Sequence, residues 1–367
     1  MNAVGPRVAV LYNAPVLAAG DPDAVSESDV MVVARAVAAG LEEQGFETRT
    51  LAAAPPVTEV LRDLDQLAPD VIFNLIEGFG GATWAASHLT GLLELAGYPY
   101  TGSPMETLAL CASKGAAKWL LKGAGLPTAP GFRIGPGEEP QRWAWDGPAF
   151  VKPDAEDGSL GIDQGSVVLD RVAAHDRVAW LQSRYGGDVL LEAYLPGPEF
   201  NVGVLALPTP VALPVAEVAY EPRAGAWPIL TYDAKWSVGS EEDRASPVVC
   251  PARVERELAA TLAQLAVSAF QVTGCRDYAR VDFRLDERGD PLILEVNPNP
   301  DIGPTAGWAR ALRASGRDYA ATLADLVRQA WARRSSWERD ADVSAKGTPR
   351  AGLLARGGDG SRSQPRG

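Results

Sequence analysis

The sequence has little of two residue types, and each shortage excludes a class of chemistry. The 367-residue chain holds three cysteines and two histidines. Cys111, Cys250 and Cys275 are widely spaced and odd in number, which favours reduced core thiols over a disulfide or zinc framework. Because His88 and His175 are the only histidines, histidine-based metal sites and catalytic triads are poorly supplied.

Basic charge and long apolar runs are also scarce. The chain has 34 Lys and Arg residues against 47 Asp and Glu, which gives a net charge of −13 at pH 7. The basic residues are scattered, whereas binding to a phosphate backbone requires a basic patch, so we expect no nucleic-acid partner. No window of about twenty residues is free of charge, and the N-terminus lacks a basic start followed by an apolar run. We therefore expect no membrane partner and predict a cytoplasmic protein.

Two nucleotide-binding fingerprints are missing. Neither G-x-x-x-x-G-K-[ST] nor G-x-G-x-x-G occurs, so neither a P-loop nor a dinucleotide-binding fingerprint would explain nucleotide binding. A dehydrogenase that binds NAD at residues 78–81 has little else in its favour. The length and the hydrophobic content of 46% instead indicate a folded protein of about two or three domains.

The first hundred residues alternate between strand and helix patterns. Residues 7–13 and 70–76 are typical of buried strands, and residues 29–44 and 84–95 carry apolar positions at helical spacing. This order predicts a parallel α/β domain, whose ligands bind beyond the carboxyl ends of the strands.

From residue 104 the pattern changes to mostly short strands. Residues 107–125, 171–185 and 253–272 are typical of helices, and a strand is expected at 149–153. The change predicts an α+β region and at least one domain boundary. Residues 333–367 are rich in Gly, Ser, Arg and Pro with few large apolar groups, so we predict a disordered tail there.

The segment RVDFRLDERGDPLILEVNPNP, residues 280–300, predicts a β-hairpin. With Arg288 and Gly289 at the tip, Asp282 faces Glu295 and Arg280 faces Asn297. One face of the hairpin is expected to lie in the core, with residues Val281, Phe283, Leu285, Leu292, Leu294 and Val296. On the other face, two opposed carboxylates destabilise a sheet unless something neutralises them.

Two explanations remain open for this polar face. In the first, the face is solvated and neighbouring arginines neutralise the carboxylates. Alternatively, the face binds Mg²⁺, because hard divalent ions prefer carboxylate and amide oxygens and keep positions for phosphates. Asp282, Glu295 and Asn297 are the right ligand types for such a site.

Two further segments carry polar groups at strand ends. In FVKPDAEDGSLGID, Lys152 ends a strand before a turn with Gly158, Ser159 and Gly161, which suits a phosphate-binding loop or an ordinary glycine-rich turn. In LLEAYLPGPEF, residues 190–200, an apolar strand is followed by a Pro-Gly-Pro turn. This segment suits either an adenine and ribose site or an edge-strand turn.

In this order and spacing, the segments resemble the ATP-grasp superfamily and, within it, the D-alanine–D-alanine ligase family. The similarity extends from about residue 7 to residue 328. Further segments that carry it are FNLIEGFGG (73–81), LLELAGYPYTGS (92–103), SKGAAKWLL (113–121), LEAYLPGPEFNVGVL (191–205), YDAKW (232–236) and CPA (250–252). The resemblance implies a three-part fold in α/β and α+β style, with an N-terminal parallel α/β domain (1–103) and two sheet-containing parts (104–190 and 191–332) that enclose ATP.

The resemblance also implies roles for individual residues. Lys114 and Lys152 would contact the nucleotide phosphates. Glu192 and the backbone near Ala193 and Leu195 would bind adenine, and Glu199 would bind the ribose. The implied metal ligands are Asp282, Glu295 and Asn297, for two Mg²⁺ ions or Mn²⁺. The implied catalytic residues are Arg280, Ser159 and Lys235.

The activity implied is ATP-dependent amide formation between a small carboxylate and a small amine. The carboxylate first becomes an acyl phosphate, and the amine then displaces phosphate, while residues 227–246 form a lid that excludes water. A homodimer is common in such families.

The substrate half departs from the family pattern. The opening G-G-x-S-x-E-R stretch is missing, and Glu27 is either a substitute for its Glu or a helix N-terminal acid stabilised by the dipole. Trp236 replaces a Tyr, Glu77 replaces a His, and Asp301 replaces a Gly at the oxyanion site. Glu27, Glu77 and Asp301 are therefore candidate substrate-binding residues. The sequence predicts a ligase with altered amino-acid specificity or, alternatively, an ATP-binding protein of the same fold without ligase activity.

Overall fold

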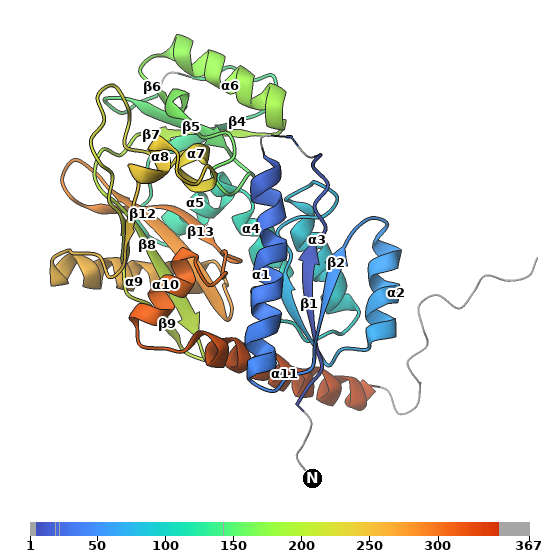
Figure 1. The fold of residues 1–367 in the computed structure, drawn as a ribbon. Coiled ribbons are helices and arrows are strands. Elements are labelled where there is room, and N and C mark those ends of the chain that lie inside the picture. The colour runs from blue at the N-terminus through green and yellow to red at the C-terminus, as the bar shows by residue number, and fades with distance from the viewer. Residues whose placement is uncertain (1–4, 19, 22, 142, 345–367) are drawn as a thin grey trace, which may run out of the picture.

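The structure is built around three β-sheets from successive parts of the chain (Figure 1). The computed structural model describes residues 5–344, except for 19, 22 and 142. The first sheet is parallel, with strand order β2-β1-β3. Its elements are β1 (Val8–Asn13), α1 (Ala24–Glu43), β2 (Thr48–Ala53), α2 (Val57–Leu67), β3 (Val71–Leu75) and α3 (Ala85–Leu95). β1 is buried on both faces because Val8 and Val10 pack toward α1, whereas Ala9 and Leu11 pack toward α2 and α3.

The second sheet is antiparallel, with strand order β4-β7-β5-β6. The helix α6 covers its outer face (Figure 1). The elements of this part are α4 (Met105–Cys111), α5 (Lys114–Gly123), β4 (Gly131–Ile134), β5 (Ala149–Pro153), a 3₁₀ turn (Gln164–Ser166), β6 (Val167–Val168), α6 (Arg171–Tyr185) and β7 (Val189–Ala193). The division expected at 190/191 falls inside β7, which pairs with β4 and β5.

The third sheet is also antiparallel, with strand order β11-β10-β8-β12-β13 and β9 paired with β8. The helix α9 packs on one face of it, and α7 and α8 lie between this sheet and the second one (Figure 1). The elements are β8 (Glu199–Ala206), β9 (Pro210–Ala212), β10 (Ala216–Val218), α7 (Tyr232–Trp236), α8 (Glu241–Arg244), β11 (Val248–Val249), α9 (Arg256–Val272), β12 (Tyr278–Leu285), β13 (Pro291–Asn297), α10 (Gly307–Ala314) and α11 (Tyr319–Ser344).

The predicted parallel α/β unit and the strand-rich region after it are confirmed, with two elements added. β2 and α2 are absent from the prediction because each has few buried apolar positions, with only Val60 and Leu64 buried in α2. The helix α11 continues to residue 344, past the start of the tail predicted from 333. The rest of that predicted tail, 345–367, lies outside the described residues.

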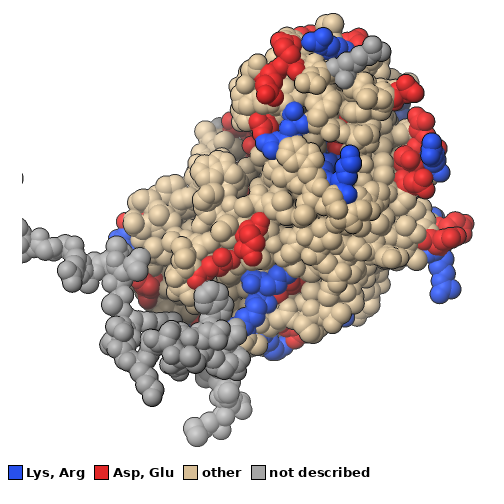
Figure 2. Space-filling view, turned by 180° about the vertical axis from the view of Figure 1, so that it is seen from behind, with Lys and Arg blue, Asp and Glu red and all other residues tan. Residues whose placement is uncertain are grey.

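The surface and the cysteines add three observations. On the face seen in Figure 2, Lys and Arg side chains are interspersed with Asp and Glu. Within the described part of the chain, no helix combines the length and apolar character that a membrane crossing requires. All three cysteines are free thiols, and Cys111 is buried.

Asp277 anchors the C-terminal helix to the other parts of the protein. Its side chain is fully buried. The carboxylate accepts hydrogen bonds from the Gly102 amide at 2.9 Å, from Gln329 Nε2 at 2.8 Å and from both terminal nitrogens of Arg333 at 2.7 and 2.8 Å. Arg333 also donates to the carbonyl oxygen of Tyr100 at 2.7 Å. One carboxylate thus joins α11 and the start of β12 to the N-terminal domain.

We predict that Asp277→Asn lowers the free energy of unfolding by about 2 to 3 kcal/mol, because the half-buried Arg333 guanidinium loses its charged partner at a fully buried position. Asn is the suitable replacement since it tolerates the positive φ of 65° at this position. Urea denaturation measures the change. The control is Asp325→Asn on α11. The exposed ion pair of Asp325 with Arg328 should contribute less than about 1 kcal/mol. Equal losses in the two variants would contradict the anchoring role.

Candidate active site

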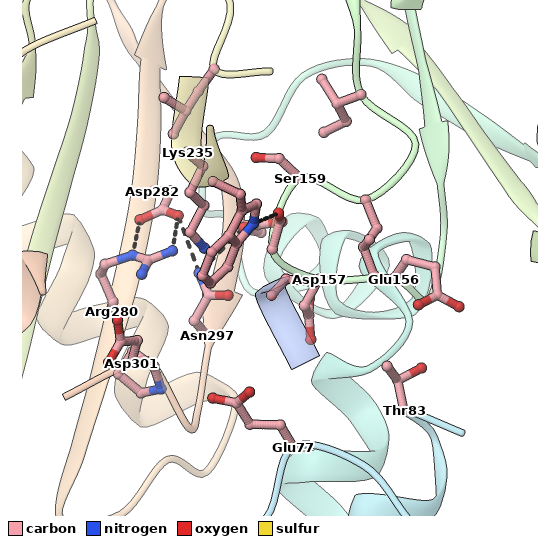
Figure 3. Close-up of a pocket in the computed structure, with 18 of the residues that line it drawn as sticks. Glu77, Thr83, Glu156, Asp157, Ser159, Lys235, Arg280, Asp282, Asn297 and Asp301 are labelled. Carbon is pink, nitrogen blue, oxygen red and sulfur yellow. Dashed lines mark hydrogen bonds and ion pairs between the residues drawn. The ribbon is translucent and has the colours of Figure 1, made fainter. Parts of the chain in front are cut away.

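All three sheets contribute to one large cavity of about 870 Å³ (Figure 3). The carboxyl end of β3 supplies Glu77, the end of β5 supplies Lys152, and the β12–β13 hairpin supplies Asp282. The cavity therefore lies beyond the strand ends of the parallel sheet, where ligands of α/β domains bind, and between the two antiparallel sheets.

The hairpin has the predicted register at its polar end. Asp282 pairs with Glu295 and Arg280 pairs with Asn297. Beyond this point a β-bulge shifts the register, so that Phe283 pairs with Ile293.

The bulge corrects the predicted core face of the hairpin. Leu294 is expected in the core but lines the cavity instead. Ile293 takes the core position and is fully buried. The period-2 pattern misplaces these two residues because an extra residue in one strand reverses which face the following side chains occupy.

Protein groups neutralise the two opposed carboxylates. Arg280 donates from Nε to Asp282 Oδ1 at 2.7 Å and from Nη2 to Oδ2 at 2.8 Å. Asn297 Nδ2 lies between the acids, 3.2 Å from Asp282 Oδ2 and 3.3 Å from Glu295 Oε1. Glu295 Oε2 is 3.7 Å from Lys114 Nζ. Burial opposes ionisation, but Lys114, Lys152 and Arg280 together lower the pKa of Glu295 to about 2.

Lys114 is held in place at the start of α5. Its buried ammonium donates to the backbone oxygen of Glu156 and to Asp157 Oδ1 at 3.2 Å. Burial disfavours its charge, but the carboxylates of Asp157 and Glu295 raise the pKa of Lys114. The carboxylate of Asp154 fixes the first turn of α5, because it accepts from the Gly115 amide at 2.7 Å.

Lys118 on α5, which the sequence analysis does not single out, pairs with the same carboxylate as Lys152, the other lysine predicted to contact phosphates. Glu192 is almost fully buried between Lys152 Nζ at 2.8 Å and Lys118 Nζ at 2.7 Å. Burial alone would raise the pKa of Glu192. The two ammonium groups lower it by more, so the net change is a decrease. The signal for Lys118 was its spacing of four residues from Lys114, which places both on one helix face. Although Glu192 Oε2 is close to Lys118, it lacks a hydrogen bond of good geometry within the described residues.

The end of β7 and the residues after it line the cavity where the sequence predicts a nucleotide wall. Ala193 and Leu195 line the cavity, and the Ala193 amide donates to the carbonyl oxygen of Pro130 at 2.9 Å. Glu199 Oε2 accepts a hydrogen bond from the Tyr220 hydroxyl at 2.7 Å. Burial raises the pKa of Glu199.

The glycine-rich loop and the predicted lid are bonded to each other. Gly158, Ser159 and Gly161 all have positive φ, at 65°, 63° and 68°. For Ser159 this conformation costs about 1 kcal/mol, which suggests a functional constraint on the loop. Trp236 Nε1 donates to the carbonyl oxygen of Gly158 at 2.8 Å, and the Tyr232 amide donates to that of Ile162 at 2.9 Å.

The predicted substrate residues come from the side of the N-terminal domain and from the loop after β13. Glu27 lies in the first turn of α1, and its Oε2 accepts a hydrogen bond from the Leu17 amide at 2.7 Å. Asp301 Oδ1 accepts from the Gly303 amide at 2.7 Å. Asp29 lines the same cavity without being predicted.

In this part of the cavity the opposite charges of Glu77 and Lys235 act on each other. Glu77 is exposed within the open cavity, yet desolvation by the surrounding protein raises the pKa of Glu77 to about 8, with Asp301 adding to the increase. Desolvation lowers the pKa of Lys235, which projects from α7, and Arg280 lowers it further. The Lys235 ammonium lies 5.0 Å from the ring centre of Trp236.

Comparisons with known proteins agree with this architecture. A D-alanine–D-alanine ligase from Bacillus anthracis, crystallised with ATP, has a TM-score of 0.69 at 17% identity and covers 91% of this chain and 100% of that chain. The D-alanine–D-alanine ligase from Coxiella burnetii has a TM-score of 0.70 at 17% identity, with coverage of 94% and 100%. The predicted three-part ATP-grasp architecture is thereby confirmed.

Sequence relatives and a family model identify the family. Residues 122–328, more than half of the chain, match the family model for the D-ala D-ala ligase C-terminus. A D-alanine–D-alanine ligase of Gluconobacter oxydans is 32% identical over 310 residues, which cover 84% of this chain and 96% of that protein. An uncharacterized protein of Sinorhizobium fredii is 32% identical over 300 residues, with coverage of 80% and 86%. The chain therefore belongs to the D-alanine–D-alanine ligase family of ATP-grasp enzymes.

Proposed function

We propose that this protein is an ATP-dependent, ADP-forming ligase that joins a small carboxylate to a small amine. The observation that carries the proposal is the convergence of the Asp282–Glu295 pair with Lys114 and Lys152 at one end of the cavity. Charged groups of both signs that converge on one cavity suit a ligand that carries phosphates together with a bound cation.

The nucleotide fits the residues present. Glu192 lines the cavity between Lys118 and Lys152, and the lone pairs that its carboxylate oxygens keep suit the exocyclic amine of adenine. Leu195 and Leu294 supply apolar surface for the ring, and Glu199 suits a ribose hydroxyl. Lys114 and Lys152 supply positive charge for the phosphates.

The metal site also fits by its donor types. Asp282, Glu295 and Asn297 would hold Mg²⁺, as two ions, or Mn²⁺, and the ions would supply positive charge to the phosphates. Among the described residues, no group of three or more His, Cys, Asp or Glu side chains forms a metal cluster. A site with two carboxylates and one amide agrees with that finding, because ATP would provide the remaining oxygens.

The chemistry follows from the weakness of a carboxylate as an electrophile. Its oxygen would attack the γ-phosphorus of ATP, and ADP would leave. The amine nitrogen would then attack the carbonyl carbon of the acyl phosphate, so that the C–N bond forms and phosphate leaves. The residues of the chain would neutralise charge and position the reactants, with Arg280 and Lys235 beside the transferred phosphoryl group and Ser159 in the loop above it.

The substrate half supports a specificity other than two D-alanines. Glu77, Asp301 and Asn13 surround the space beyond Asn297, and Trp236 forms its upper edge through the lid. An ATP-binding protein without ligase activity is not favoured, because the charged groups expected of the reaction are assembled in one cavity. The expected cytoplasmic location and homodimer stay predictions.

We predict that Glu295→Gln lowers ADP formation with an accepted substrate pair at least about 100-fold, because it removes one of the two opposed charges that would hold the metal. Steady-state ADP release over a Mg²⁺ titration is the measurement. The matched control is Glu287→Gln in the exposed turn of the same hairpin, which should retain wild-type turnover. Full activity of Glu295→Gln would exclude the proposed metal site.

We also predict that Trp236→Phe uncouples ATP use from amide formation. The variant keeps an aromatic ring but loses the hydrogen bond to Gly158, about 1 kcal/mol, so that the lid opens more often and water reaches the acyl phosphate. The ratio of phosphate released to amide formed should rise several-fold. Trp331→Phe on α11, away from the cavity, is the control, and an unchanged ratio in Trp236→Phe would argue against the lid.

The raised pKa of Glu77 predicts a pH-dependent stability. Between about pH 4.5 and pH 8 the unfolded state loses this proton while the folded state keeps it, so the ligand-free protein loses stability as pH rises through this window. Glu77→Gln should therefore have a Tm that exceeds that of the wild type progressively more up to about pH 8, and by a constant amount above it. Thermal scans from pH 5 to about pH 9 test this. A Tm difference that does not change with pH would show that Glu77 titrates normally.

A further inference from the structure

Asp154 is a buried carboxylate that the proposed chemistry does not use. It follows the last residue of β5, two positions after Lys152, and only 2% of its surface is exposed. Lys152 and Asp157 line the large cavity, whereas Asp154 is not among the described residues that do. A buried charge away from the space for ligands must be held by protein partners.

The partners of Asp154 lie at the first turn of α5. Its backbone oxygen accepts a hydrogen bond from the Lys114 amide at 3.0 Å, and its Oδ1 accepts from the Gly115 amide at 2.7 Å. Its Oδ2 accepts from the hydroxyl of Ser113, the residue before the helix, at 2.6 Å. The first amides of a helix have no partner within the helix, and Asp154 supplies one for each of these two. The Asp154 amide donates to the carbonyl oxygen of Asp188 at 3.0 Å, which fixes Asp154 to the start of β7.

Gly115 allows the helix to approach this carboxylate closely. A Cβ atom at Gly115 would lie 2.4 Å from Cδ of Arg133 and 3.0 Å from Asp154 Oδ1. Arg133 Nε is 3.4 Å from Asp154 Oδ2, so a guanidinium compensates the buried negative charge. The close packing leaves little room for α5 to slide along the end of β5.

The two lysines predicted to contact phosphates lie on the two sides of this contact. Lys152 belongs to β5, and Lys114 is the first residue of α5. The Lys114 ammonium is 3.7 Å from Glu295 Oε2 and 3.2 Å from Asp157 Oδ1. The Asp157 side chain is 65% exposed, so a phosphate can take its place. The buried contacts of Asp154, at the backbone of Lys114, do not depend on that exchange.

We infer that Asp154 is a positioning residue for the nucleotide triphosphate, because it fixes Lys114 relative to Lys152. This inference rests on the nucleotide site of the proposed function and does not depend on the amide-forming step. Asp154 acts through Lys114, by holding α5 against the end of β5, and does not itself touch ATP. The two ammonium groups are thereby presented to one chain of phosphates.

The charge of Asp154 by itself gives the opposite expectation. A carboxylate near a phosphate site repels the phosphates, so its removal would strengthen nucleotide binding. Loss of an anchor instead misplaces an ammonium group that attracts phosphates, and binding becomes weaker. The sign of the change in affinity therefore distinguishes positioning from charge.

The test is calorimetric binding of a non-hydrolysable ATP analogue with Mg²⁺, and of adenosine, to full-length Asp154→Ala. The variant should bind the analogue at least about tenfold more weakly than the wild type. Its adenosine affinity should stay within about twofold, because Glu192 and the end of β7 are unchanged. Asp154→Asn keeps the size of the side chain and gives the same comparison if the alanine variant does not bind adenosine.

Two other acids provide matched controls. Asp163 also accepts from a glycine amide at 2.7 Å and from an arginine at 3.0 Å, but it is not among the described residues that line the cavity. Asp163→Ala should bind both ligands as the wild type does. Asp157→Ala should bind the analogue at least as tightly as the wild type, because it removes a competitor of phosphate for Lys114.

Three outcomes would overturn the positioning role. The first is an unchanged or higher affinity of the Asp154 variants for the analogue. The second is an equal loss of affinity for the analogue and for adenosine, which would indicate a general structural defect. The third is the same selective loss in Asp163→Ala or Asp157→Ala.

The same measurements separate this inference from the proposed function. A wild-type protein that binds the analogue no more tightly than adenosine would refute the nucleotide site, and both proposals with it. Tight wild-type binding that Asp154→Ala and Asp154→Asn retain would refute the positioning role alone. A selective loss in the variants, without ADP formation by the wild type from any carboxylate and amine, would support the positioning role and refute the ligase function.

Discussion

The site depends on placing two carboxylates opposite each other on adjacent strands. Asp282 and Glu295 occupy directly paired positions, an arrangement that weakens a sheet unless it is compensated. Arg280 and Lys114 provide that compensation in the ligand-free protein, and the Asn297 amide bridges the two acids. The same charges, all held at short range by neighbours, are the ones that a metal and phosphates would use.

Buried charge also fixes the helix that carries the lysines. Lys114 and Lys118 lie on one face of α5 and reach different carboxylates, Glu295 in the hairpin and Glu192 in the central sheet. Each ammonium is desolvated and depends on its acid partners and on one backbone carbonyl, that of Glu156 for Lys114 and that of Ile293 for Lys118. A displacement of α5 relative to either sheet would therefore leave buried charges unpaired, so the hairpin and the central sheet are held in a fixed relation.

The substrate half is built on a different principle. Around the proposed nucleotide site, opposite charges are paired at 2.7 to 3.7 Å, whereas neither Glu77 nor Asp301 has a protein cation within 4.0 Å among the described residues. Their repulsion is tolerated in a space open to solvent. The lid contributes Lys235 and Trp236 to both halves, because α7 lies where the two sheets meet.

The sequence by itself determined what depends on near neighbours in the chain. Alternation along residues 280–297 places Asp282 opposite Glu295, because a short turn fixes the pairing of a hairpin, and the order of strand and helix patterns predicts the parallel domain. Tertiary structure decided the rest. The bulge at Leu294 exchanges core and cavity residues, Glu192 is shared by two lysines, and Glu77 and Asp301 line one cavity from separate parts of the chain. No local periodicity encodes these contacts, because they follow from how separate sheets pack around one cavity.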